Sequence, residues 1–478
     1  MSAAGVAAGV PPAALDPAPL LARGVTLMRE LGLGEGDRVG VLLGNDSPTF
    51  GILAAACLEG VVAVPLPPDL AAGEVAEVLD DAEPTCVLTS PAWAAALSGR
   101  HERVEVVDAA RFDALAGTDP SSPWPRTRPM AYTSGTTGRR KGVHVGVHDP
   151  VWGREVIEDE HVAFDRRHGD VHLVVSPLYH SGPFRFALVT ALLGGRVAVL
   201  PRFDARAWSA AMRAVRPTSL FCVPTHLHRL LADSDDPRED LASLRLLAHA
   251  GAPCPVPLKE RVLDAAPAGS VWEFYGSTEG QFTTCPPDVW QATPGTVGRA
   301  RPGRHLTVRG ADGGRLPAGQ VGTVWAEVPD HARFAYWRDP ARTAAAWDGD
   351  AFTVGDLGHL DPHGRLFLAG RPGDLVITGG VNVYPAEVER HLLGLPGVAE
   401  AAVFGLPDDD WGERLVAVVV PWPGADLDGE ALRGALADRL SRAKAPKDVL
   451  VVDELPRTAT GKILRAGTAL ADLWEHRT

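Results

Sequence analysis

Short β-rich runs alternate with stretches of helical spacing along the first 270 residues, and this alternation sharply limits the folds open to the chain. Helical spacing at 19–31 opens this region, and within residues 20–200 β-rich runs such as 38–43 and 61–66 are separated by further segments with helical spacing. Residues 170–270 repeat the pattern, with runs such as 219–223. Such alternation is typical of a mainly parallel, doubly wound sheet covered by helices. The sequence therefore predicts an α/β fold with a large N-terminal domain of stacked, doubly wound α/β subdomains.

The pattern of residue types changes after Thr293. Gly and Pro residues punctuate short strands such as 321–328, which predicts a compact β subdomain that ends near Asp374. Beyond it, helical spacing at 385–393 and 429–440 combines with β-rich runs, which predicts a separate small α+β lobe. We therefore expect a loose lead, a large N-terminal domain and a small mobile C-terminal domain, with bounds of 1–18, 19–373 and 374–478.

The charge balance disfavours two classes of partner. The 478-residue chain carries 46 basic and 60 acidic residues, a formal net charge of −14. Such a negative field repels phosphate backbones and anionic lipid surfaces, so we expect no nucleic-acid partner and no membrane-surface partner. The longest apolar run, 186–200, is interrupted by Gly194, Gly195 and Arg196 and is too short to span a bilayer.

The cysteines and the first residues indicate a compartment. The five cysteines are scattered and never spaced as Cys-x-x-Cys, which argues against a disulfide framework or a zinc site. No basic residue precedes Arg23, so the first residues lack the charged start of a signal peptide. We therefore expect a cytoplasmic protein.

Residues 130–143 gather the groups that bind a polyphosphate. Glycines let backbone amides approach closely, hydroxyls donate hydrogen bonds, and Lys141 adds a cation. Only five of the 46 basic residues are lysine, which gives Lys141 added weight as a compact ammonium group. Arg140 stands where a Walker loop requires glycine, so this is a different loop. The expected phosphate-binding residues, besides Lys141, are Thr133, Ser134, Gly135, Thr136, Thr137 and Gly138.

This segment resembles the phosphate-binding loop of the AMP-forming acyl-adenylate superfamily, which includes acyl-CoA synthetases, luciferases and the adenylation domains of peptide synthetases. Further motifs of the family follow in the family's order, from Met130 to Lys462, at 176–183, 250–253, 273–279, 354–358, 370–371, 378–389 and 456–462. The resemblance implies an enzyme that uses ATP and Mg²⁺ to convert an organic acid into acyl-AMP, with release of pyrophosphate.

The resemblance assigns one group of residues to the nucleoside. Gly251, Ala252 and Pro253 correspond to a small-residue wall beside adenine, Phe274 or Tyr275 to its stacking partner, and Gly276 to the turn that follows. Asp356 corresponds to the carboxylate that holds both ribose hydroxyls, a task that suits an acceptor facing two donors. Arg371 corresponds to an arginine that assists at the ribose and the phosphate.

A second group of residues is assigned to the reaction. Thr278 and Glu279 correspond to the catalytic pair of the family, in which the glutamate binds magnesium; a hard carboxylate suits that ion. His180 corresponds to a gate beside the acyl pocket. Lys462 corresponds to the C-terminal lysine that contacts the attacking carboxylate and the phosphate, and Asp374 to the hinge of the small lobe.

Residues 378–389 resemble the CoA-ligase version of the family, which places Gly379 and Gly380 beside the pantetheine arm of CoA and implies thioester formation as the second step. A carrier-protein pantetheine, an amine or another small nucleophile remains an alternative acceptor. A non-catalytic nucleotide-binding regulator and a luciferase-like oxygenase are rival functions. The acid stays open between aryl, cinnamyl, fatty and an unusual oxyanion, and a homodimer is expected only by analogy. The region before Met130 receives no function.

Overall fold

A parallel sheet with strand order β2-β1-β3-β4 forms the first unit of the chain. Its strands are β1 (Arg38–Leu42), β2 (Val62–Pro65), β3 (Cys86–Thr89) and β4 (Val104–Val106). The helices of this unit are α1 (Pro17–Glu30), α2 (Ser47–Glu59), α3 (Ala72–Ala82), α4 (Pro91–Leu97) and α5 (Ala109–Asp113). A Cβ on Gly24 would lie 2.5 Å from the carbonyl oxygen of Gly51, so α1 and α2 pack this closely only because both positions are glycine.

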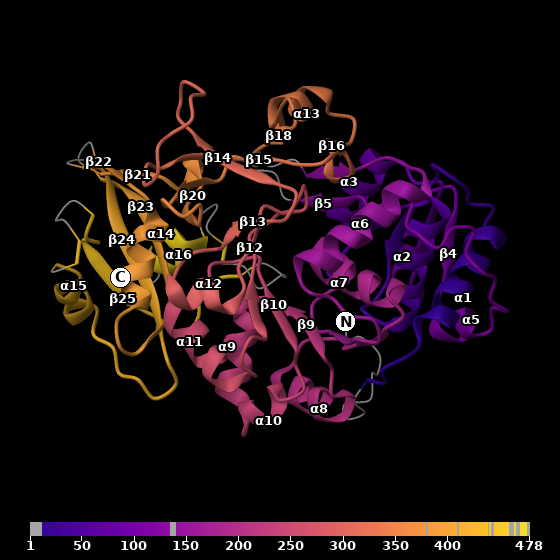
Figure 1. Ribbon diagram of the computed structural model, residues 1–478, viewed down its shortest axis with the longest axis horizontal. Helices are drawn as coiled ribbons and strands as arrows, with labels where there is room; N and C mark the ends of the chain where they lie inside the picture. Colours follow the sequence, from indigo (N-terminus) through magenta and orange to yellow (C-terminus); the bar gives the residue numbers. More distant parts are fainter. Residues whose placement is uncertain are drawn as a thin grey trace.

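The computed structural model describes residues 12–133, 140–378, 381–408, 411–437, 439–440, 444–457, 463–464 and 469–475. Figure 1 shows the first unit in indigo at one end of the molecule and the C-terminal lobe in yellow at the other.

A second parallel sheet, of order β11-β10-β9-β7-β8, occupies the centre of the chain. Its strands are β7 (Val171–Val174), β8 (Arg196–Val199), β9 (Ser219–Cys222), β10 (Leu246–His249) and β11 (Val271–Glu273). The surrounding helices are α6 (Pro150–Ala163), α7 (Ser181–Leu192), α8 (Ala205–Val215), α9 (Pro224–Asp233), α10 (Pro237–Leu241), α11 (Val256–Ala265) and α12 (Pro287–Ala292). Strands β9 and β10 are buried throughout, as expected for parallel strands covered on both faces.

Antiparallel strands make up the third unit, which is the β subdomain that the Gly/Pro punctuation predicts. One sheet has the order β17-β18-β15-β19-β20, with β14 pairing β15. Its strands are β14 (His305–Arg309), β15 (Gly322–Glu327), β17 (Trp347–Asp348), β18 (Ala351–Phe352), β19 (Leu357–Leu360) and β20 (Leu366–Gly370). A short pair joins β12 (Thr283–Thr284) to β13 (Arg299–Ala300), and the helical segments are η1 (Asp330–Ala332) and α13 (Pro340–Ala346).

A small sheet of order β16-β6-β5 joins this subdomain to the segment around the phosphate-binding loop. Its strands are β5 (Ala131–Thr133), β6 (Lys141–His144) and β16 (Ala335–Tyr336). Tyr336 pairs with Val143 across β16 and β6, and Thr133 pairs with Lys141 across β5 and β6. The pairing therefore holds Lys141 beside a strand that lies almost 200 residues further along the chain.

The C-terminal lobe has its own sheet, of order β22-β21-β24-β23, with β25 parallel to β24 (Figure 1). The segment η2 (Pro372–Asp374) leads into it. The strands are β21 (Val376–Thr378), β22 (Val381–Val383), β23 (Val398–Asp408), β24 (Gly412–Pro421) and β25 (Asp448–Val451), and the helices are α14 (Pro385–Leu393), α15 (Gly429–Ala437) and α16 (Ala469–Glu475). A separate hydrophobic cluster that includes Val388, Val403 and Leu436 forms its core. The predicted α/β fold class, with a large N-terminal part and a small C-terminal part, is confirmed.

Trp422, just after β24, connects this lobe to the central unit. Its ring stacks on His228 of α9 with centroids 4.5 Å apart, and the guanidinium of Arg261 of α11 lies 4.3 Å from the ring centroid. Arg457 donates to Thr225 at 3.2 Å. The two lobes are therefore in direct contact along α9 and α11. In the part of the chain that the structure describes, no helix is long and apolar enough to cross a bilayer.

Candidate active site

The residues assigned to the nucleotide follow the carboxyl ends of two neighbouring parallel strands. Strand β10 ends at His249 and leads into Gly251, and β11 ends at Glu273 and leads into Tyr275. Ligands of open α/β sheets bind at this edge, because the loops there are free of the sheet's hydrogen bonding. The two motifs therefore lie where a nucleotide site is expected.

Lys141, Glu279 and Tyr336 meet at one carboxylate oxygen. Oε1 of Glu279 accepts from Nζ of Lys141 at 2.9 Å and from the phenol of Tyr336 at 2.8 Å. Nζ of Lys141 also donates to the Tyr336 oxygen at 3.0 Å and lies 4.3 Å from the ring centroid. The Glu279 side chain is only 5% exposed. This arrangement gives a buried, charged centre built from β6, β16 and the loop after β11.

The charges at this centre are set by the same contacts. Burial alone would raise the pKa of Glu279, but the Lys141 ammonium and the two hydrogen bonds outweigh burial and hold that pKa below its usual value. Burial and the neighbouring Glu279 charge raise the pKa of the Tyr336 phenol. Glu279 is therefore an anion and Tyr336 a neutral donor at physiological pH.

A second group forms around Asp356, in the turn before β19. Oδ2 of Asp356 accepts from the Tyr275 phenol at 2.5 Å, and Oδ1 pairs with Nε of Arg371 at 2.7 Å. The amide of Val324 donates to the Asp356 carbonyl at 2.9 Å, which fixes the turn on β15. Burial and the nearby Asp356 charge raise the pKa of Tyr275 well above its usual value. Three residues that the sequence assigned to the nucleoside are thus in direct contact.

The two aromatic residues offered as adenine partners have different surroundings. The Phe274 ring packs against Phe164, Phe186 and Phe221, with centroids 5.3, 6.0 and 5.8 Å away, inside a buried aromatic cluster. Phe274 therefore packs mainly within the core, and its assignment as an adenine partner stays a prediction. Tyr275 stacks on Phe282 at 4.6 Å and points its hydroxyl at Asp356. Its assignment as an adenine partner likewise stays a prediction.

The neighbouring turns have the backbone that the motifs require. Gly251 has a φ of +88°, a conformation that side chains disfavour, so glycine is needed before Ala252 and Pro253. Gly276 bridges to Gln281, and the amide of Ser277 donates to the Gly280 carbonyl at 2.8 Å. This tight turn presents Thr278 and Glu279 at its tip.

His180 lies at the N-cap of α7, where the chain leaves β7 and enters the helix. Its ring meets Tyr179 edge-on with centroids 4.5 Å apart. Of the phosphate-binding loop the structure describes Thr133 and Lys141; the expected residues Ser134, Gly135, Thr136, Thr137 and Gly138 lie outside the described residues, as do Gly379, Gly380 and Lys462. Asp374, the expected hinge, ends η2, and its amide donates to the Arg371 carbonyl at 3.0 Å.

Sequence reasoning missed Tyr336. Its backbone amide donates to Thr343 at 2.9 Å, and Asp339 caps the helix α13 that carries Thr343. The Asp-Pro pair at 339–340 is a helix-start signal that marks this turn in the sequence. Nothing local, however, indicates that the tyrosine before it faces Lys141.

Lys259 was also left without a role, although it is one of five lysines. It lies on α11 fully buried, and its ammonium contacts Nε2 of His249 and lies 3.5 Å from Oε2 of Glu273. His249 and Glu273 are partners across β10 and β11. Burial and the Lys259 charge lower the pKa of His249 well below its usual value, and burial raises that of Glu273. This buried cluster lies directly behind the strand ends that carry Gly251 and Tyr275.

The donor set can be compared with the magnesium ion that the sequence resemblance implies. Glu279 offers a buried, ionised carboxylate with Oε1 already hydrogen bonded, which fits a hard cation that takes most of its ligands from phosphate and water. Within the described ranges, no group of three or more His, Cys, Asp or Glu side chains is placed to hold a metal by itself. The residues therefore fit an ion that arrives with ATP.

Comparisons with known proteins agree with this geometry. The AMP-binding enzyme family matches residues 21–336, and the AMP-binding enzyme C-terminal domain matches residues 387–462. The chain is 34% identical over 453 residues to indoleacetate–CoA ligase of Aromatoleum aromaticum (88% of this chain, 86% of the relative) and 35% identical over 448 residues to feruloyl-CoA synthase of an Amycolatopsis species (92% and 89%). The crystal structure of ATP-bound MatB from Rhodopseudomonas palustris superposes with a TM-score of 0.82 at 30% identity, over 96% of this chain and 92% of that one. The chain belongs to the AMP-binding enzyme family of adenylate-forming enzymes.

Proposed function

We propose that the protein is an AMP-forming acid:CoA ligase, which converts a carboxylic acid and ATP into acyl-AMP and pyrophosphate and then transfers the acyl group to the thiol of CoA. The observation that carries the proposal is the meeting of Lys141, Tyr336 and Glu279 at one buried carboxylate oxygen. The relatives named for indoleacetate and feruloyl thioesters support CoA as the acceptor.

In the first half-reaction, the described residues bind and orient ATP. Asp356, held by Arg371 and Tyr275, accepts hydrogen bonds from the ribose hydroxyls and fixes the nucleoside. The Lys141 ammonium neutralises charge on the phosphates as pyrophosphate leaves, and its preorganised position supplies electrostatic stabilisation. A magnesium ion bound beside Glu279 would supply a further positive charge to the phosphates.

The remaining roles rest on the sequence. Lys462, Thr278 and His180 act at the reacting carboxylate, and the loop from Ser134 to Gly138 holds the phosphates. In the second half-reaction, the lobe 374–478 turns about Asp374 relative to 19–373, so that Gly379 and Gly380 admit the pantetheine arm. Rotation about one hinge residue needs only a few dihedral angles to change. All five cysteines are free thiols, which supports a reducing, cytoplasmic location.

The test follows pyrophosphate release against a panel of aryl, cinnamyl and straight-chain acids, with and without CoA, with AMP and thioester measured by mass spectrometry. We expect AMP and acyl-CoA from at least one acid, and loss of both products in Glu279→Gln. Glu327→Gln, which changes an exposed carboxylate on β15 paired with Arg315, is the matched control and should retain activity.

Two outcomes would contradict the proposal, and they point to different alternative functions. Acyl-AMP and pyrophosphate without thioester would retain adenylation and exclude CoA, which directs the search to carrier-protein pantetheine, amines and other small nucleophiles. ATP binding without pyrophosphate release from any acid would instead favour a nucleotide-binding regulator.

A further inference from the structure

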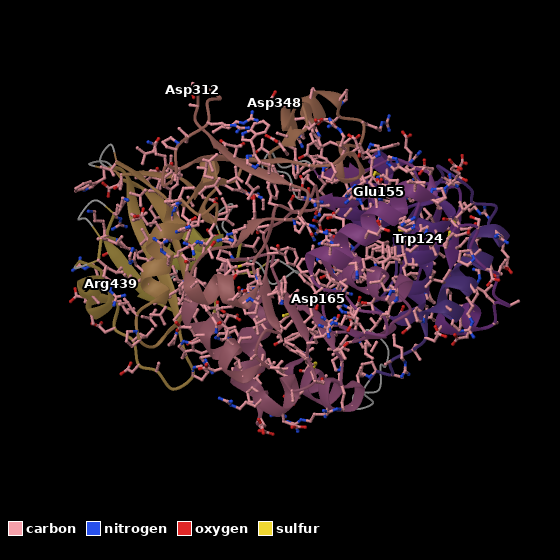
Figure 2. All side chains as sticks on the ribbon, in the orientation of Figure 1. Trp124, Glu155, Asp165, Asp312, Asp348 and Arg439 are labelled. Atoms are coloured by element: carbon pink, nitrogen blue, oxygen red, sulfur yellow. The ribbon has the colours of Figure 1, made fainter. Side chains whose placement is uncertain are left out.

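A second charged cluster lies between α6, α7 and the turn after β13, apart from the residues assigned to ATP. Asp159 and Glu160 stand at the C-terminal end of α6, four and five residues after Glu155, which Figure 2 labels on this helix. Arg304 forks onto Asp159, with Nη1 to Oδ1 at 3.0 Å and Nη2 to Oδ2 at 2.8 Å. Arg301 lies between the two carboxylates, 3.3 Å from Asp159 and 2.9 Å from Glu160.

A third guanidinium group, that of Arg185, faces the same carboxylates, and a fourth, that of Arg128, is buried and interacts with Glu160 through its charge. Nε of Arg185, on α7, lies 3.3 Å from Oε1 of Glu160. Arg128 lies before β5 and its Nη2 is buried without a hydrogen-bond partner; burial and the charges of Arg185 and Arg304 lower the pKa of Arg128 to about 10, while the charge of Glu160 opposes the change. Three arginines thus contact two carboxylates, a fourth interacts with Glu160 through its charge, and positive charge is in excess.

The arginine side chains that carry this excess positive charge are buried. The side chains of Arg301 and Arg304 are 0% and 5% exposed. Arg301 lies over the Phe164 ring, 5.6 Å from its centroid, so its surroundings are partly apolar. Charges taken out of water are tolerated when they are paired and hydrogen bonded, and an uncompensated buried charge is strongly unfavourable.

Several N–H groups of the cluster have no acceptor. Among the described residues, Nη1 of Arg301, Nε of Arg304 and Nη2 of Arg128 are buried without a hydrogen-bond partner. Buried donors without acceptors are rare in folded proteins and indicate a group that the protein chain itself does not provide. The missing acceptor must carry negative charge, because only an anion corrects both the donors and the charge.

The cluster adjoins the region where the acid is expected. The Arg301 amide donates to the Phe282 carbonyl at 3.0 Å, and Phe282 stacks on Tyr275. Arg185 is five residues after His180 on the helix that His180 caps. The Phe164 ring beneath Arg301 also packs against Phe274, 5.3 Å away. The cluster and the candidate active site therefore share their intervening side chains.

We propose that Arg128, Arg185, Arg301 and Arg304 form a binding site for a single oxyanion group, a carboxylate or phosphate, between α6, α7 and the β13–β14 turn. Guanidinium forks match the planar or tetrahedral oxygens of these groups. The oxyanion comes either from the far end of an acid substrate that carries a second anionic group, a source that rests on the proposed ligase function, or from a free inorganic anion.

The test uses inorganic phosphate as the probe, titrated by calorimetry into the full chain at fixed ionic strength. A saturating non-hydrolysable ATP analogue fills the nucleotide site, so that phosphate cannot bind there. We expect one saturable site, and at least about tenfold weaker binding in Arg128→Met, because a charge-assisted hydrogen bond is lost. Arg315→Met, at an arginine whose side chain is 66% exposed, is the matched control and should bind as the parent does.

Stability and turnover distinguish the remaining outcomes. Without phosphate, the melting temperature of Arg128→Met should be no lower than that of the parent, because the substitution removes excess positive charge. Added phosphate should raise the melting temperature of the parent more than that of the variant. If Arg128→Met fails to fold, Arg128→Lys is used in its place, because lysine retains the positive charge but lacks the two parallel N–H donors of the guanidinium group.

Paired acids of equal length, with one or two carboxylates, identify the source. At least about tenfold higher kcat/KM for the dicarboxylic acid, lost in Arg128→Met and inhibited competitively by phosphate, indicates a substrate group. Phosphate binding that the acids leave unchanged indicates a free anion. The proposal is overturned if the parent shows no saturable phosphate site and both acids give the same kcat/KM ratio in parent and variant. Phosphate binding is measured without turnover, so a failure of the ligase proposal is seen separately.

Discussion

The Lys141 ammonium and the Tyr336 phenol lie 3.0 Å apart and donate to the same oxygen of Glu279. The two donors come from β6 and β16, which are neighbours in a small antiparallel sheet. The sheet therefore sets the positions of the lysine and the tyrosine together, and with them the two hydrogen bonds that hold Glu279.

Tyr336→Phe should lower kcat/KM for adenylation about tenfold, because the hydroxyl that holds Lys141 and Glu279 in place is removed while the ring is kept. Pyrophosphate release measures the effect. Tyr132 lies on β5, the other neighbour of β6, and its hydroxyl donates to Asp81 of α3 at 2.6 Å. Tyr132→Phe removes this hydroxyl and should leave kcat/KM near the parent value. Equal effects of both changes would mean that Tyr336 only supports the sheet.

Asp356→Asn should raise KM for ATP at least about tenfold, because a neutral amide pairs poorly with Arg371 and with two ribose donors. Nucleotide binding measured by calorimetry should weaken in parallel. Asp361→Asn, in the next turn and paired with Arg365 at 2.6 Å, is a matched loss of a carboxylate away from Tyr275. Unchanged ATP affinity in the Asp356 variant would separate this residue from the ribose.

Lys259→Met should destabilise the protein by about 3–5 kcal/mol, because Glu273 is left buried without its cation. Denaturant unfolding at neutral pH gives this difference. Adding Glu273→Gln should restore part of the lost stability, since the uncompensated charge is then removed. A single and a double variant of equal stability would show that the pair contributes through packing.

Acidification should destabilise the fold through histidines that are buried and neutral. Burial lowers the pKa of His226 from 6.5 to about 3, with a further contribution from Arg229. Between those pH values the unfolded chain binds a proton that the folded chain does not, so stability falls by up to about 1.4 kcal/mol per pH unit below 6.5. His226→Gln should reduce that slope in unfolding measured from pH 7 to pH 5. An unchanged slope would assign it to other groups, such as His249.

Sequence and structure agree most clearly in the alternating helices and strands of the first unit. The helical spacing predicted at 19–31 appears as α1 (Pro17–Glu30), and the β-rich run at 61–66 as β2 (Val62–Pro65). The differences at the ends have local causes. Helix α1 begins earlier because Asp16 caps it and Pro17 suits a first helical position, a signal that the apolar periodicity does not include.

The candidate site was predictable residue by residue where a motif holds its members close together. Glu279 and Tyr275 belong to one turn, and Asp356 to another, so their residue types and order already indicate a nucleotide. The sequence left the adenine partner open between Phe274 and Tyr275, because an aromatic pair in the sequence does not tell which ring enters the core. Tyr336 was missed because its partner, Lys141, is joined to it only by the pairing of β16 with β6.

The sequence alone determined the fold class, the family and the types of charged group near ATP, because these depend on periodicity and on motifs a few residues long. Only the tertiary structure decided which charges face each other. Arg185 and Arg301 are far apart in the chain, and each by itself is an ordinary arginine. Strand order and helix packing bring them around Asp159 and Glu160, where burial in a medium of low polarity makes their excess charge matter.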